Sequence, residues 1–158
     1  MSKIALLFLC LLFAFLWGAT VSQPMPPGGP GGARDDFYSL ARRVLTQNAQ
    51  VDEGLSRVTA DIRNGKASYQ YAISEFQYYR DKVAALTAKV DVASSAGSLK
   101  NALIRALNLQ VQRCSELLDC VRFERDYGYQ AAKPKWQKEL KTYYRYQDAL
   151  RKVKDLLR

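Results

Sequence analysis

The sequence predicts an all-α fold: an antiparallel four-helix bundle or a pair of long, coiled-coil-like helical hairpins, after a signal peptide and a Pro/Gly-rich linker. In four segments of similar length, apolar residues recur at alternating spacings of four and three residues, which is typical of helices that pack lengthwise. Short stretches with glycine or proline separate the segments, so neighbouring helices are expected to run antiparallel. An open coiled coil that dimerises or trimerises is the alternative.

The first 22 residues have the layout of a secretory signal peptide. Lys3 provides a positive charge, Ile4–Trp17 is an unbroken apolar run, and small residues lead to an expected cleavage after Ser22. A helix over that run reaches about 21 Å, which is short of a bilayer core of about 30 Å. Counted through Val21 the run is long enough for a tilted span, so the protein is expected to be secreted or periplasmic, or membrane-anchored if the signal is uncleaved.

Residues 23–33 consist mainly of proline and glycine. Proline fixes φ and removes a hydrogen-bond donor, and glycine adds backbone entropy, so this segment is predicted to be a disordered linker. The helical bundle domain is therefore predicted to cover residues 34–158.

The first helix is predicted from about Asp35 to Arg63, ending at Asn64 and Gly65. Asn48 is the one polar residue on its stripe. At a core position Asn48 would fix the helix register, whereas at the helix edge it would face water, and the pattern leaves both open. The stripe consists of Phe37, Ala41, Val44, Asn48, Val51, Leu55, Val58 and Ile62.

The other three helices are predicted from the same alternating four- and three-residue spacing of apolar residues. Ser68 is the expected N-cap of the second helix, Gly128 the expected end of the third, and Pro134 is expected in the first turn of the fourth. The predicted stripes are Tyr69, Ala72, Phe76, Tyr79, Val83, Leu86, Val90 and Ala93; then Leu103, Leu107, Val111, Cys114, Leu118 and Val121; and last Trp136, Leu140, Tyr143, Leu150, Val153 and Leu157.

The chain contains no histidine, which removes the commonest general base and the commonest metal ligand. The glycines at 28–32 lie in the linker with no strand before them, so they do not form a phosphate-binding loop. The carboxylate pairs Asp35–Asp36 and Asp52–Glu53 fit a helix N-terminus and a solvated helix face. We therefore expect no enzyme: no catalytic residue, cofactor, metal or small-molecule substrate.

Two cysteines follow the signal peptide, Cys114 and Cys120. Six residues along a helix rise about 9 Å, whereas a disulfide needs Cα atoms within about 7 Å, so the two are not expected to bond to each other. Cys114 lies on the apolar stripe and is expected to be buried. Cys120 lies beside it, where an intermolecular disulfide is open.

Tyrosine and positive charge mark the candidate binding surface. Consecutive helical residues point about 100° apart, so Tyr78 and Tyr144 are expected near the surface, either at the edge of the core or as a contact surface. The net charge is +9, and residues 131–158 hold nine basic and three acidic residues. Within them Lys138, Lys141, Arg145 and Lys152 form a row opposite the apolar stripe, either a solvated face or a surface for an anionic partner.

These features predict an exported, non-enzymatic interaction or scaffold protein that binds a protein partner or self-associates. The alternative is a basic helical protein that binds anionic lipid surfaces or cell-envelope polyanions, as basic amphipathic helices do. Nucleic acid is not an expected partner of an exported chain.

Overall fold

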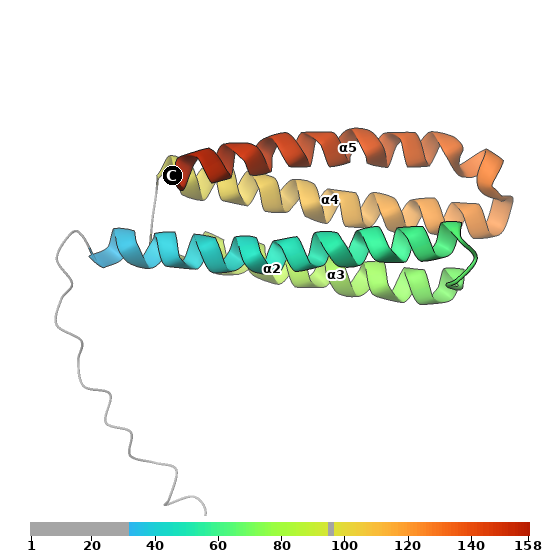
Figure 1. The fold of residues 1–158 in the computed structure, drawn as a ribbon, viewed down its shortest axis with the longest axis horizontal. Coiled ribbons are helices and arrows are strands. Elements are labelled where there is room, and N and C mark those ends of the chain that lie inside the picture. Colours follow the sequence, from blue (N-terminus) through green and yellow to red (C-terminus); the bar gives the residue numbers. More distant parts are fainter. Residues whose placement is uncertain (1–31, 95–96) are drawn as a thin grey trace, which may run out of the picture.

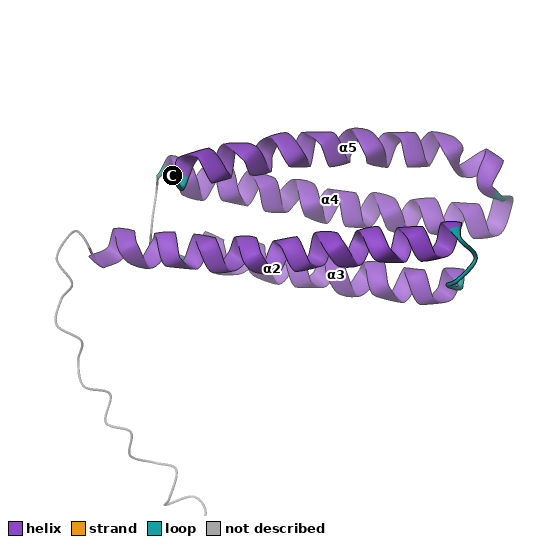
Figure 2. Cartoon of the chain, viewed as in Figure 1, coloured by secondary structure: helices purple, strands orange, loops and turns teal. Residues whose placement is uncertain are grey.

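A computed structural model, which describes residues 32–94 and 97–158, shows four long helices and no strand in these residues (Figures 1 and 2). They are α2 (Gly32–Arg63), α3 (Tyr69–Asp91), α4 (Ser98–Tyr127) and α5 (Tyr129–Leu156). The four helices lie lengthwise beside one another, which confirms the all-α class and is consistent with a four-helix bundle. The predicted signal peptide lies outside the described residues, and α2 begins at Gly32, two residues before the predicted domain start.

The turns form where the sequence predicts them. Gly65 lies in the connection between α2 and α3 and has a φ of +66°, a conformation that glycine adopts without steric cost. The Ser68 hydroxyl accepts a hydrogen bond from the Tyr71 amide (3.2 Å) and so caps α3, as predicted. Gly128, with a φ of +82°, separates α4 from α5. At the other connection the Lys100 ammonium donates to the carbonyl of Asp91 (2.6 Å), which ties the start of α4 to the end of α3.

The helices pack in chain order, so one side of the bundle is wider than the others. Helix α3 packs against α2 and α4, and α4 packs against α5. No Cα atom of α2 lies within 8 Å of a Cα atom of α5. Only side chains can therefore join α2 to α5 on this side.

The predicted stripes of α2 and α3 are confirmed as core. All eight α2 positions are buried, including Asn48 at 1% exposed, so the core interpretation of Asn48 is correct. On α3 the six positions from Ala72 to Val90 are buried, and Tyr69 and Ala93 pack against the core from its edge. Burial of these apolar side chains supplies most of the stabilisation, at about 25 cal/mol per Å².

Helix α5 departs from the prediction in two ways. Leu140, expected in the core, is 45% exposed, and Glu139 and Tyr146 are buried in its place. The four-three alternation runs from Trp136 through these two polar residues because both find partners in the interior. Pro134 lies well inside α5 and not in its first turn, since the helix already begins at Tyr129.

Gly54 allows α2 and α3 to approach closely. A Cβ atom at this position would lie 2.3 Å from the Oη and Cζ atoms of Tyr79, a side chain that is itself buried on α3. Any larger residue at 54 would therefore displace the Tyr79 ring.

We expect Gly54→Ala to destabilise the protein. Overpacking costs about 1–3 kcal/mol, which exceeds the gain in helix propensity of about 1 kcal/mol. Urea unfolding followed by circular dichroism measures the difference, with Gln50→Ala on the exposed face of α2 as the control within about 0.5 kcal/mol. A Gly54→Ala variant as stable as the parent would show that this close approach is wrong.

Candidate functional site

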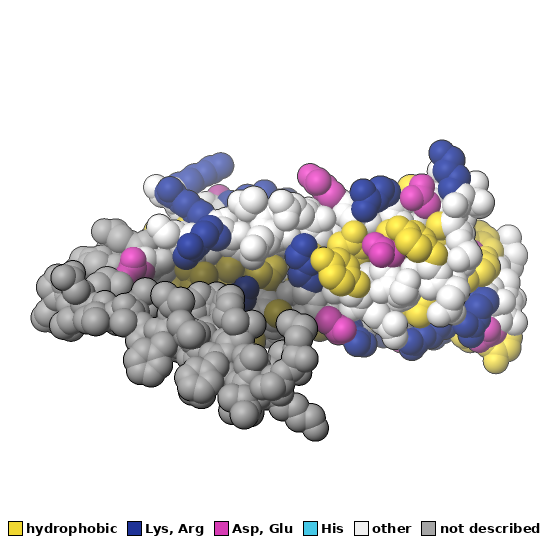
Figure 3. Space-filling model, turned by 90° about the horizontal axis from the view of Figure 1, so that it is seen from below, with side chains coloured by type: hydrophobic (Ala, Val, Ile, Leu, Met, Phe, Trp, Pro, Cys, Tyr) yellow, Lys and Arg dark blue, Asp and Glu magenta, His cyan; other side chains and the backbone are white. Residues whose placement is uncertain are grey.

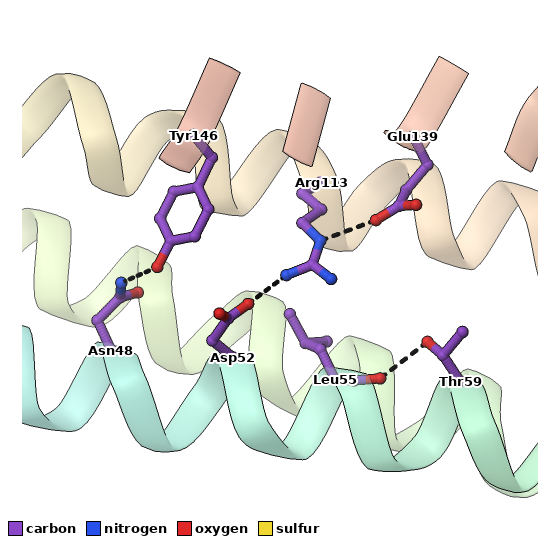
Figure 4. A network of polar contacts seen from close by, with 7 residues as sticks. All are labelled: Asn48, Asp52, Leu55, Thr59, Arg113, Glu139 and Tyr146. Atoms are coloured by element: carbon purple, nitrogen blue, oxygen red, sulfur yellow. Dashed lines mark hydrogen bonds and ion pairs between the residues drawn. The ribbon is translucent and has the colours of Figure 1, made fainter. Parts of the chain in front are cut away.

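The wide side of the bundle is bridged by polar side chains from three helices (Figure 4). Asn48 on α2 donates a hydrogen bond from Nδ2 to the hydroxyl of Tyr146 on α5 (2.6 Å), and both side chains are buried. Burial, with the nearby charge of Asp52, raises the pKa of Tyr146, so its hydroxyl stays neutral. This contact joins α2 to α5 where their backbones do not meet.

Arg113 on α4 connects the same two helices. Its Nε donates to Glu139 on α5 (2.8 Å), and its Nη1 donates to Asp52 on α2. Its guanidinium also lies over the Tyr143 ring, 4.4 Å from the ring centre. Burial alone would lower the pKa of Arg113, but the hydrogen bond to Glu139 and the charges of Glu139 and Asp52 outweigh it and raise the pKa. The arginine thus stays charged between two carboxylates.

These contacts fix the rotation of α5 about its axis. Glu139 and Tyr146 point into the bundle, whereas Arg145, which directly precedes Tyr146, and the more distant Lys152 are exposed. Both line a groove between α5 and α4, with a volume of about 500 Å³. The groove lining comprises Ser98, Asn101, Ala102, Arg105, Leu109, Arg145, Asp148, Ala149 and Lys152.

A second hollow of about 400 Å³ continues this groove along α4. The two share Asn101, Arg105, Leu109 and Arg145, and the second adds Ile104, Asn108 and Gln112. We call the two hollows together the α4–α5 groove.

Positive charge predominates in the α4–α5 groove. Arg105, Arg145 and Lys152 form no ion pair with any side chain in residues 36–94 and 97–158. The one acidic lining residue, Asp148, is paired with Arg151 (3.3 Å). The groove therefore offers three cations from two helices to an anionic ligand.

The structure brings together only part of the predicted basic row. Arg145 and Lys152 line the groove, whereas Lys141 is exposed outside its lining. The Lys138 ammonium lies 3.5 Å from the buried carboxylate of Glu116 on α4, so Lys138 forms an ion pair at the edge of the core. Arg105 was missed because a single arginine on α4 shows no pattern until the packing of α4 on α5 is known.

The predicted tyrosines are exposed but lie apart. Tyr144 on α5 is 59% exposed and Tyr78 on α3 is 56% exposed, and neither lines the groove. Figure 3 views the molecule from the side of α2 and α3, and hydrophobic side chains gather there on the part of the surface that the grey atoms do not cover. Tyr78 and Tyr144 thus lie outside the lining of the α4–α5 groove.

The structure buries Cys120, at which the sequence leaves an intermolecular disulfide open. Both Cys114 and Cys120 are free, and both are fully enclosed by the core. An intermolecular disulfide through Cys120 would require this part of the core to open. Burial raises the pKa of each thiol to about 12, so neither forms the reactive thiolate at neutral pH.

The comparisons with known proteins give no assignment: no family model, curated protein or solved structure matches the chain. Within the part of the chain that the structure describes, no helix is long and apolar enough to cross a membrane. In the same residues no three cysteine or carboxylate side chains gather as metal ligands would.

We expect Cys114 and Cys120 to resist a thiol reagent such as dithionitrobenzoate at pH 8 until the protein unfolds. The raised pKa of the two thiols favours the neutral form in the folded state, so the stability that comes from keeping them neutral is complete below pH 9 and is lost as the pH rises toward 12. The rate of thiol labelling with and without urea measures how accessible the two cysteines are. Rapid labelling of the folded protein would show that the thiols are accessible.

Proposed function

We propose that this chain is an exported, non-enzymatic interaction protein that binds an acidic segment of a partner protein in the α4–α5 groove. The observation that carries the proposal is the set of three cations, Arg105, Arg145 and Lys152, without an acidic partner in the described residues. Folded proteins keep such charges together at low cost only on a solvated surface, and a cluster of one sign attracts the opposite sign.

The shape of the site favours a protein segment over a lipid surface. The cations stand along a recess between two helices, and a recess admits a chain more readily than it meets the flat plane of a bilayer. Apolar side chains, Ala102 and Leu109 among them, lie in the same recess. Protein partners supply both carboxylates and apolar groups, whereas a polyanion supplies charge alone.

Export and the absence of catalysis belong to the same proposal. They are supported by the apolar run Ile4–Trp17 and by the lack of histidine in the sequence. Binding is the role that remains when neither a cofactor nor a reactive side chain is needed.

We expect the triple variant Arg105→Gln, Arg145→Gln, Lys152→Gln to bind poly-L-glutamate at least about tenfold more weakly than the parent. Each exposed charge contact contributes about 0.5 kcal/mol, and three sum to about the 1.4 kcal/mol that a factor of ten requires. Isothermal titration calorimetry at low salt measures the affinity. Circular dichroism confirms that each variant is folded.

The matched control removes three other exposed cations, Lys66→Gln, Lys89→Gln and Arg122→Gln, with the same loss of charge. Its affinity is expected to stay within about twofold of the parent, apart from a weak long-range effect. Equal weakening in both triple variants would overturn the groove as the site. Groove-dependent binding to phosphatidylglycerol vesicles that exceeds binding to poly-L-glutamate would favour the lipid alternative instead.

A further inference from the structure

We propose that the segment bound in the α4–α5 groove is an acidic amphipathic helix that lies lengthwise between α4 and α5. This inference rests on the proposed function and specifies the conformation and the residue pattern of the partner.

The length of the groove suits a helix. Its lining on α4 extends from Ser98 to Gln112. Fourteen residues of helical rise span about 21 Å, which is the length of four turns of a bound helix. A helix of that length can contact several side chains of each neighbour at once.

The floor of the groove follows a second stripe on α4. Ala102, Arg105, Leu109 and Gln112 repeat the four-three spacing on a different face from the core stripe of Leu103, Leu107 and Cys114. The buried Ala102 and Leu109 form the floor itself. Ala149 adds another small side chain from α5. Small residues permit a third helix axis to approach to about 8–10 Å, where its ridges fit the grooves of α4 and α5.

The walls determine the charge of the bound helix. Arg105 stands on the α4 side, and Arg145 and Lys152 stand on the α5 side. A helix whose apolar stripe meets the floor presents the residues flanking that stripe to both walls. Glutamate or aspartate at these flanking positions would pair with all three cations, and the amides of Asn101 and Asn108 can donate to the remaining carboxylate oxygens.

An extended acidic segment fits less well. Extended peptides gain affinity from a free sheet edge or from an aromatic-lined polyproline groove. The described residues contain no strand, and no aromatic side chain lines the α4–α5 groove. A helix satisfies its own backbone groups and needs only the side-chain contacts that the groove supplies.

Two synthetic peptides of 21 residues and identical composition test the inference. In the first, leucine and alanine form one stripe flanked by glutamate, and in the second the same residues are scrambled. We expect the amphipathic peptide to bind the protein at least about tenfold more tightly by fluorescence anisotropy, because only it pairs floor and walls together, a gain of about 1.4 kcal/mol. Its helicity should rise on binding.

Variants of the floor sharpen the test. Ala149→Tyr fills the groove and should weaken the amphipathic peptide at least about tenfold, whereas Ala49→Tyr on the exposed face of α2 should leave it unchanged. Asn108→Asp places a carboxylate in the groove and gives a second variant that does not depend on tolerance of a bulky residue.

Equal binding of the two peptides would overturn the inference, while groove-dependent binding of poly-L-glutamate would leave the proposed function standing. If neither the peptides nor poly-L-glutamate bound in a groove-dependent way, both the inference and the proposed function would be overturned.

Discussion

The arrangement of this bundle depends on one buried guanidinium. Arg113 of α4 reaches Asp52 on α2 and Glu139 on α5, the two helices whose backbones do not meet. Removing one partner from such a group leaves an uncompensated buried charge, which costs about 3–5 kcal/mol. Apolar burial stabilises the bundle as a whole, and on α5 it includes Trp136 and Val153. The ion contacts of Arg113 and the hydrogen bond from Asn48 to Tyr146 add the polar contacts that link α5 to α2.

The orientation of α5 connects this interior to the surface. Because Glu139 and Tyr146 point inward, Arg145 and Lys152 stand at the boundary with α4, opposite Arg105. A rotation of α5 that buried Leu140 instead would move the two cations away from α4 and open the recess. The α4–α5 groove is therefore a consequence of polar contacts on the far side of the same helix, and those contacts position the site without touching a ligand.

The sequence alone predicts all four helices and much of their core. Apolar spacing identifies α2 completely, and even the polar member Asn48 follows the stripe. On α5 the same reasoning correctly predicts that Trp136 and Val153 are buried, but it places Leu140 in the core on hydrophobicity and Glu139 outside it, and both of these placements are wrong. A carboxylate enters the core only when a cation meets it there, and the cation belongs to another helix. Pairing between residues 26 positions apart carries no signal in a pattern of single residues.

The candidate site shows the same limit. Arg145 and Lys152 were predicted from the charge imbalance of the last helix, since a row of basic residues opposite an apolar stripe can be read from spacing. Arg105 was not, because its role comes from the packing of α4 on α5. Lys138 belongs to the same row, yet its ammonium lies near Glu116. Spacing places residues on one face, but only the neighbouring helix shows which of them remain free to bind.

The unfolding free energy of Arg113→Met tests the central claim most directly. Urea unfolding at pH 7 should show a loss of about 3–5 kcal/mol, because Asp52 and Glu139 remain as unpaired carboxylates. The triple variant Asp52→Asn, Arg113→Met, Glu139→Gln, which leaves no charge at these positions, should recover at least half of that loss. Arg113→Met within about 0.5 kcal/mol of the parent would contradict the account, because α5 would then be held without the guanidinium.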